Sequence, residues 1–219
     1  MIKKIITLIA LSLLWCSSSL ALPKCEDQKS DKLCEITKIY PDGAKYVGGW
    51  KNGFREGQGT LKYADGSVYV GGWKKSKPYN QGTLKYVDGS KYVGGWKNGL
   101  RHGQGSFAYA DGSIYVGQWM QSERRQGTLT YKDGRKYTGG WKESEPHGQG
   151  IFTYADGSKY TGGWKAGLLH GEGTFIYADG SEYTGGWKAS ERHGQGTFTE
   201  KSGKKYAGQF QDGNFIKQR

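Results

Sequence analysis

Residues that could carry chemistry recur at fixed positions along this sequence. A lysine directly follows six of the repeated tryptophans, an aspartate occurs in seven Tyr-x-Asp-Gly sequences, and a histidine precedes four Gly-x-Gly sequences. The sequence contains no Gly-x-Ser-x-Gly elbow, no His-Glu-x-x-His pair and no phosphate-binding loop. We therefore expect a protein that is not an enzyme and uses no cofactor, and the recurring residues become candidates for binding.

The lysines are the strongest candidates for a ligand-binding surface. If each sequence unit adds two strands, equivalent residues recur about every 10 Å and the lysines form a basic stripe. Such a stripe suits an anionic membrane, at roughly 1 kcal/mol for each lysine near the headgroups. The alternative is that the lysines only keep the sheet soluble. The candidate lipid- or anion-binding residues are Lys51, Lys74, Lys97, Lys142, Lys165 and Lys188.

The aspartates and histidines are expected to have structural roles. Each aspartate stands beside a glycine in a turn sequence such as Ala64-Asp65-Gly66, which is typical turn chemistry. Neighbouring histidines about 10 Å apart cannot share a zinc ion, whose nitrogen ligands lie at about 2.1 Å. We therefore expect no metal site at His102, His147, His170 and His193.

Tyrosine and tryptophan set the period of the sequence. The tryptophans from Trp50 to Trp187 are 23 residues apart, except for one step of 22 between Trp119 and Trp141. Isoleucine, leucine and valine are scarce, so we expect the rings to form the core. The alternative is that they line a groove for an extended peptide, a glycan or an acyl chain. The residues of this predicted aromatic groove are Tyr46, Trp50, Tyr69, Trp73, Tyr92, Trp96, Tyr115, Trp119, Tyr137, Trp141, Tyr160, Trp164, Tyr183 and Trp187.

Self-similarity at this period predicts an array of small repeated elements. Alternation along Tyr46–Trp50 places both rings on one face with Gly48 between them. Alternation along Gly57–Tyr63 places Leu61 and Tyr63 on one face together with Gly57 and Gly59. Each unit is therefore two short strands with one aromatic and one polar face, and the glycines leave room for rings to lie flat on the backbone.

Two kinds of connection join the predicted strands. Tyr63–Ser67 predicts a three-residue hairpin loop with a left-handed glycine, and this odd length lets Leu61 face Tyr69. The other connection, Lys51–Glu56, is expected to be a longer loop. We place the residue missing from the short step in the matching loop at Ser122–Gln126, because loops tolerate deletions.

Apolar residues recur beside this second connection. Phe54, Leu100, Leu168 and Leu169 are expected in loops along one edge of the sheet, where they would insert shallowly into a membrane or contact a partner.

The N-terminus has the layout of a secretory signal peptide. Lys3 and Lys4 precede an apolar run, Ile5 to Trp15, that is short for a membrane span, and Ser19-x-Ala21 fits a cleavage site. We therefore expect an exported protein that is periplasmic or secreted. Association with a membrane after export is compatible with this expectation. An uncleaved anchor and a lipoprotein cysteine at Cys16 are the alternatives.

Cleavage would leave Cys25 and Cys34, an even pair that predicts a disulfide acting as a structural clasp. A metal or redox pair is the alternative, and the absence of Cys-x-x-Cys spacing argues against it. The formal net charge is +12, to which Lys3 and Lys4 contribute two. For an exported chain this balance favours an anionic membrane surface or acidic glycolipid as partner, and not nucleic acid.

The segment Tyr92–Gly112, YVGGWKNGLRHGQGSFAYADG, resembles the MORN (membrane occupation and recognition nexus) repeat, and the resemblance extends from Tyr40 to about Gly213. It implies an all-β fold: an elongated single-layer antiparallel sheet of about eight consecutive β-hairpin repeats. It also implies phospholipid binding, membrane association, self-association or scaffolding. Asn80 departs from the pattern in place of a glycine, and Phe210 in place of a tryptophan.

We divide the chain into a signal peptide (1–21), a disulfide-clasped lead-in with a half repeat (22–39), the repeat array (40–213) and a C-terminal tail (214–219). The predicted function is a non-enzymatic scaffold on an anionic membrane or phospholipid surface. The alternative is a protein-interaction scaffold or homodimer that uses the aromatic groove or the terminal edge strands.

Overall fold

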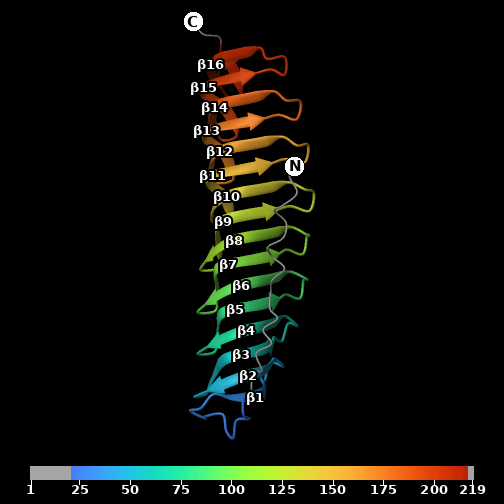
Figure 1. The fold of residues 1–219 in the computed structure, drawn as a ribbon, viewed down its shortest axis with the longest axis vertical. Helices are drawn as coiled ribbons and strands as arrows, with labels where there is room; N and C mark the ends of the chain where they lie inside the picture. The colour runs from blue at the N-terminus through green and yellow to red at the C-terminus, as the bar shows by residue number, and fades with distance from the viewer. Residues whose placement is uncertain (1–20, 217–219) are drawn as a thin grey trace, which may run out of the picture.

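The computed structural model describes residues 21–216 as one antiparallel sheet of 17 strands, in which each strand pairs with the next along the chain. Figure 1 shows the strands in chain order along one elongated ribbon, which confirms the predicted all-β architecture. This part of the chain has no helix that could cross a membrane. Residues 1–20 of the predicted signal peptide lie outside it. The strands are β1 (Cys34–Ile39), β2 (Lys45–Lys51), β3 (Phe54–Lys62), β4 (Val68–Lys74), β5 (Lys77–Lys85), β6 (Lys91–Lys97), β7 (Leu100–Ala108), β8 (Ile114–Met120), β9 (Glu123–Thr130), β10 (Lys136–Lys142), β11 (Glu145–Thr153), β12 (Lys159–Lys165), β13 (Leu168–Ile176), β14 (Glu182–Lys188), β15 (Glu191–Thr199), β16 (Lys205–Gln211) and β17 (Asn214–Ile216).

The first kind of connection is the predicted three-residue loop. The Gly66 amide donates to the Tyr63 carbonyl oxygen at 3.1 Å, the Tyr63 amide donates to the Ser67 carbonyl oxygen at 2.8 Å, and Gly66 has a φ of +92°. Asp65 accepts a hydrogen bond of 2.8 Å from the Ser67 amide. Leu61 pairs with Tyr69, which confirms the predicted register.

The second kind of connection differs from the prediction of a long loop over Lys51–Glu56. Lys51 pairs with Phe54, and only Asn52 and Gly53 lie between them, with φ angles of +50° and +81°. Two left-handed residues are typical of the type I′ hairpin turn, whose twist matches that of the flanking strands. We call these two-residue turns the tips, and the long edge of the sheet that carries them the tip edge.

The shortened repeat keeps its tip, because Met120 pairs with Glu123. In the other repeats, the strand that follows the tryptophan strand contains a β-bulge. Three residues lie between Arg101 and Gly105 in β7, whereas only two lie between Arg124 and Gly127 in β9. The predicted assignment of the deletion to a loop is therefore wrong, because the bulge inside the strand absorbs it.

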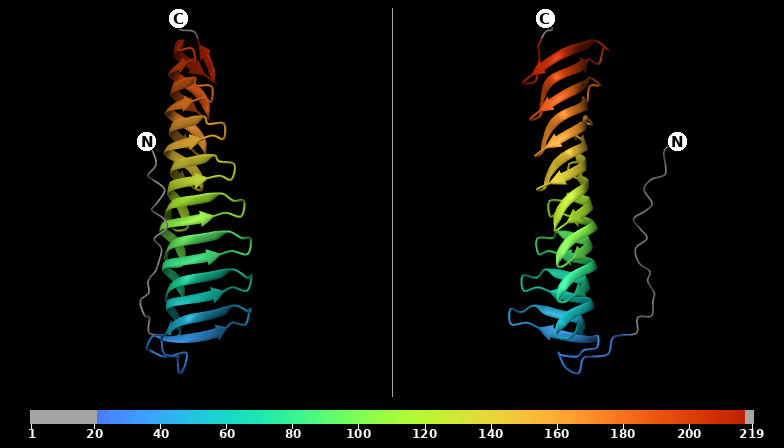
Figure 2. Two further views of the ribbon diagram at one scale, coloured as in Figure 1. Left: turned by 45° about the vertical axis from the view of Figure 1, so that its right-hand side comes forward. Right: turned by 90° about the vertical axis from the view of Figure 1, so that its left-hand side faces the viewer.

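The two faces of the sheet have different environments. The strands bend around the long axis in both views of Figure 2, which curls the sheet across its width. On the face that bears the repeated tyrosines and tryptophans, Tyr69 is fully buried, whereas Val70 on the opposite face is 50% exposed. We call these the inner face and the outer face.

A continuous chain of aromatic contacts runs along the inner face. Tyr46 meets Trp73 edge to face with ring centroids 5.5 Å apart, Trp73 meets Tyr69 at 4.9 Å, and Tyr69 meets Trp96 at 5.3 Å. The same alternation continues to Phe210, which closes the series against Tyr183 at 4.9 Å. T-shaped pairs of this kind contribute about 0.5–1.5 kcal/mol each beyond the area that they bury.

Each of these tyrosines lies flat on a glycine, as the sequence predicts. A β-carbon added to Gly105 would come within 2.6 Å of ring carbons of Tyr92. The glycine on the strand opposite therefore leaves the space that the buried ring occupies.

The N-terminal lead-in takes the place of a preceding repeat. Trp50 donates through Nε1 to the carbonyl oxygen of Gln28 at 2.8 Å, whereas later tryptophans donate to a glycine carbonyl of the preceding strand. The Asn52 amide donates to the Ser30 carbonyl oxygen at 2.7 Å. The predicted disulfide between Cys25 and Cys34 closes this segment against β1, which pairs with β2 as the predicted half repeat.

The C-terminal end has a shorter cap. Residues 214–216, assigned from the sequence to a tail, form β17 and pair with only Gln209–Gln211 of β16. Phe215 lies 5.2 Å from Phe210 between ring centroids and is 40% exposed.

Replacing Gly105 by alanine should destabilise the protein by about 3 kcal/mol, because the new methyl group overlaps the buried Tyr92 ring. Chemical denaturation of Gly105→Ala measures this loss. Ser106→Ala is the control in the same strand, since Ser106 points to the outer face and its substitution should change stability by less than about 0.5 kcal/mol. Equal losses in the two variants would contradict the proposed role of the glycine.

Removing the disulfide with Cys25→Ser and Cys34→Ser should loosen the N-terminal end by about 2–3 kcal/mol. In a linear array this effect should remain close to the end where it arises. Hydrogen exchange should therefore accelerate in β1 and β2 and stay unchanged in β10–β14. Uniform acceleration along the whole sheet would argue against a local clasp.

Candidate binding surfaces

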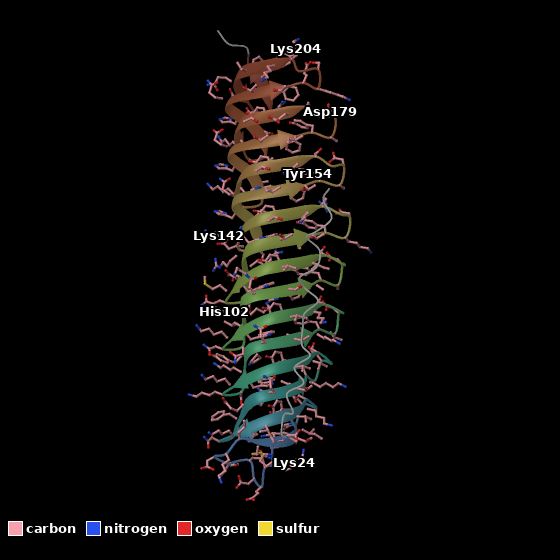
Figure 3. All side chains as sticks on the ribbon, in the orientation of Figure 1. Lys24, His102, Lys142, Tyr154, Asp179 and Lys204 are labelled. Carbon is pink, nitrogen blue, oxygen red and sulfur yellow. A yellow bond between two sulfur atoms is a disulfide. The ribbon has the colours of Figure 1, made fainter. Side chains whose placement is uncertain are left out.

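The six predicted lysines all lie on the outer face at the tip edge, and all are exposed. Figure 3 shows Lys142 and His102 at this edge, and Asp179 toward the other. The residues that pair with the lysines differ along the sheet, and glutamates occur among them only in the later repeats. Lys51 and Lys97 pair with Phe54 and Leu100, and Lys74 pairs with Lys77. Lys142 and Lys188 pair with glutamates, Glu145 and Glu191, and Lys165 pairs with Leu168.

The four apolar residues expected in loops lie on different faces of the sheet. Phe54, Leu100 and Leu168 are 43–49% exposed and lie on the outer face, in strands rather than in loops. Leu169 is only 5% exposed and joins the inner-face core, so its expected exposure is wrong. Alternation explains the difference, because successive residues of a strand point to opposite faces.

The residues predicted to line an aromatic groove form its buried floor. The repeated tyrosines from Tyr46 to Tyr183 have no exposed surface, and the tryptophans are 3–7% exposed. A ligand on the inner face would instead meet a second, half-buried layer in which rings such as Phe175 and Tyr177 lie 4.5 Å apart. The tyrosines of this layer are Tyr40, Tyr63, Tyr86, Tyr109, Tyr131, Tyr154 and Tyr177.

An arginine row on the inner face was missed by the sequence analysis. The guanidinium carbon of Arg101 lies 4.4 Å from the ring centroid of Trp119, and its Nη2 donates to the carbonyl oxygen of Ser122 at 3.0 Å. The signal was present, since the row is the fifth residue after each tryptophan. Its members are Arg55, Pro78, Arg101, Arg124, Pro146, Leu169 and Arg192.

Each arginine of the row joins two repeats. Arg55 covers Trp73 at 4.3 Å and donates to the Ser76 carbonyl oxygen, and Arg124 covers Trp141 at 4.0 Å and donates to the Ser144 carbonyl oxygen. A stacked guanidinium that also donates to a carbonyl uses both the flat face and the edge of the group.

Burial governs the chemistry of the core tyrosines. Desolvation raises the pKa of Tyr92, Tyr115, Tyr137 and Tyr160 to about 12. Each phenol donates to a backbone carbonyl oxygen, as Tyr92 does to Gly95 at 2.9 Å. These groups therefore stay neutral and act as anchors for the backbone.

The aspartates lie in turns, where they accept backbone hydrogen bonds, as Asp111 does from the Ser113 amide at 2.8 Å. The four histidines are half-buried beside the tips. No three histidine, cysteine, aspartate or glutamate side chains within residues 21–216 come together as a metal-binding group.

The MORN repeat family model matches seven consecutive segments, at residues 46–68, 69–91, 92–114, 115–134, 137–159, 160–182 and 183–204. No curated protein matches the sequence.

Two solved structures have a similar fold. One is the TCP domain of SAS-4 (dCPAP) of Drosophila melanogaster in complex with a proline-rich motif of Ana2 (dSTIL). It is 12% identical with a TM-score of 0.43, covering 86% of this chain and 99% of that one. The other is the G-box domain of the microcephaly protein CPAP, 13% identical with a TM-score of 0.41, covering 81% and 99%. Both scores are below 0.5, so neither likeness informs the function of this chain.

The raised tyrosine pKa values predict a loss of stability at alkaline pH. The folded protein favours the neutral phenol, so the free energy of unfolding should hold up to about pH 10, the pKa of an exposed tyrosine, and fall as the pH rises toward 12. Thermal unfolding followed by circular dichroism, together with phenolate absorbance, measures both events. A folded protein whose tyrosines all ionise near pH 10 would contradict the burial.

Proposed function

Because the chain belongs to the MORN-repeat family, we propose that it is a peripheral scaffold that binds an anionic membrane or phospholipid surface through the outer face of its first three repeats. The MORN repeat is a non-catalytic repeat module, and a scaffold is the role that the family supports. We call the outer face of β2–β7 the basic surface. An exported location, as the N-terminal sequence suggests, would bring this surface against lipid headgroups outside the cytoplasm.

The distribution of charge carries the proposal. Residues 45–108 contain eleven lysines and arginines against three aspartates and glutamates, whereas residues 109–204 contain twelve against eleven. Nearly all of the net positive charge of the array is therefore in its first three repeats. The exposed lysines of the basic surface are Lys45, Lys51, Lys62, Lys74, Lys77, Lys85, Lys91 and Lys97.

Exposed apolar side chains accompany the lysines at the tip edge. Phe54 is 49% exposed and pairs with Lys51, and Leu100 is 43% exposed and pairs with Lys97. This combination suits a peripheral membrane surface, where apolar side chains enter the headgroup layer and lysines contact the anionic lipids. In the later repeats Glu145 and Glu191 pair with Lys142 and Lys188 and oppose such contact, and only Lys165 has an exposed apolar partner, Leu168.

Flotation with vesicles of phosphatidylserine and phosphatidylcholine tests the proposal. The triple substitution of Lys51, Lys74 and Lys97 by glutamate should weaken binding by about a hundredfold or more, at roughly 1 kcal/mol for each lysine. The matched control replaces Lys142, Lys165 and Lys188 by glutamate, an identical change of charge, and should weaken binding by less than about threefold.

Two results would contradict the proposal. One is equal binding of the unaltered protein to neutral and anionic vesicles at low salt. The other is an equal loss in the two triple variants, which would mean that net charge matters and the position of the lysines does not.

The inner face favours a second function, the binding of a polypeptide. The supporting observation is a hollow of about 410 Å³ lined mainly by aromatic and apolar residues of β11–β14. Self-association is one form of this role, and light scattering tests it, because a constant monomer mass at high concentration would exclude a homodimer.

A further inference from the structure

The arginine row has one long interruption. Four of its seven positions are arginines, and each guanidinium lies over the aromatic ring of the next repeat. Pro146 and Leu169 are consecutive members of the row and cannot supply that group. The other interruption, at Pro78 between Arg55 and Arg101, is a single position long.

The rings under this interruption are less covered than their equivalents. Trp164 and Trp187 are 7% and 6% exposed, whereas Trp73 and Trp119, which lie under arginines, are 3% and 4% exposed. Both tryptophans line the hollow of about 410 Å³, although each shows only 6–7% of its surface. We call this hollow the arginine gap.

The gap also contains the hydrogen-bond acceptors that arginines use elsewhere. Arg101 and Arg192 donate to the carbonyl oxygens of Ser122 and Gly213 at the next tip. The equivalent tip residues beside Pro146 and Leu169 are Gly167 and Ser190, since their amides donate to the carbonyl oxygens of those two residues. Gly167 and Ser190 both line the hollow, and no guanidinium within residues 21–216 donates to their carbonyl oxygens.

We propose that the arginine gap binds two arginine side chains of a partner polypeptide, held three residues apart in a polyproline-II segment. This rests on the polypeptide-binding role proposed for the inner face. Each incoming guanidinium stacks on Trp164 or Trp187 and donates to the carbonyl oxygen of Gly167 or Ser190. It thereby repeats the contacts that Arg101 makes with Trp119 and Ser122.

The spacing of the two positions selects the conformation of the partner. Equivalent residues of adjacent repeats are two strands apart, about 10 Å. A polyproline-II helix rises about 3.1 Å per residue with three residues per turn, so residues i and i+3 lie on one side about 9.3 Å apart. In a β-strand, residues i and i+3 point to opposite sides, and residues i and i+2, which share a side, are only about 6.6 Å apart.

The surrounding charges permit a cationic ligand here. Residues 109–204 have almost no net charge, and Glu143 lies in the tip between β10 and β11. Glu145 and Glu191 pair with Lys142 and Lys188 on the outer face and do not face the gap. Arg124 and Arg192 occupy the row positions on each side, which limits the gap to two guanidinium groups. Lysine fits less well, because its ammonium is strongly hydrated and lacks the flat donor group of arginine.

Isothermal titration calorimetry of the full chain with a blocked peptide of sequence Pro-Pro-Arg-Pro-Pro-Arg-Pro-Pro tests the proposal. We expect binding that is at least tenfold tighter than for the same peptide with lysine in place of arginine. We also expect it to be at least tenfold tighter than for a peptide with one proline between the arginines. Tryptophan fluorescence should change on binding, since Trp164 and Trp187 form the floor of the gap.

Two variants test whether the row position itself is responsible for binding. Leu169→Arg places the chain's own arginine at a position where Arg192 and Arg124 are already tolerated, and it should weaken binding of the peptide at least tenfold. Leu168→Arg is the matched control: it adds the same charge one residue away on the outer face, and should change binding by less than twofold. Thermal unfolding of both variants verifies that they remain folded.

Equal binding of the arginine and lysine peptides would overturn the proposal, as would equal effects of the two variants. Failure of the arginine peptide to bind at millimolar concentration would also overturn it. If an equivalent leucine peptide binds and the arginine peptide does not, the gap is an apolar subsite. The arginine assignment then fails while the polypeptide-binding role of the inner face stands.

Discussion

The structure depends on the edge-to-face contact between each tyrosine and the tryptophans on either side of it. A single-layer sheet has no second layer to bury its rings, so the rings must cover one another. Tyr92, for example, contacts Trp96 at 5.1 Å and Trp119 at 5.5 Å, and lies over Gly105. Because each tyrosine contacts the tryptophan of its own strand and that of the next repeat, the core is a line of rings and stability is shared between adjacent units.

This linear core explains how the ends are built. A ring at the first repeat lacks a predecessor, and the disulfide-closed lead-in supplies the missing acceptor for Trp50 through Gln28. The last ring lacks a successor, and Phe210 is covered by Phe215 of the short β17. An open sheet of this length is protected at its ends by local caps, since an uncovered edge strand would pair with other chains.

The same core leaves two positions in each repeat free to vary. One is the outer-face residue that pairs with the tip lysine, which is Phe54 in one repeat and Glu191 in another. The other is the row position, which is arginine or an apolar residue. Substitutions at the first position change the charge of the outer face, and substitutions at the second change how far the tryptophan of the next repeat is shielded. Neither disturbs the contacts between tyrosines and tryptophans. A uniform backbone can therefore carry a basic surface in its first repeats and an aromatic hollow without arginines in its later ones.

The sequence by itself determined the repeats, the paired strands, the turn at Asp65-Gly66, the half repeat at β1 and the disulfide. Each of these follows from short-range alternation, turn residues or a count of cysteines. It did not determine the tips, because only pairs such as Asn52-Gly53 carry a turn signal. Lys75-Ser76 forms the same left-handed turn through bonds to Arg55 of the preceding repeat.

Tertiary structure alone decided which residues a ligand can reach. The tyrosines and tryptophans are large and periodic, and only their mutual packing shows that they are the floor of the inner face and not its lining. The six lysines are equivalent in sequence, but their partners across the strand pair separate Lys51 from Lys188. Cross-strand neighbours depend on the register of the whole hairpin, including its bulge. That register is fixed only when the tyrosines and tryptophans of neighbouring repeats pack against one another.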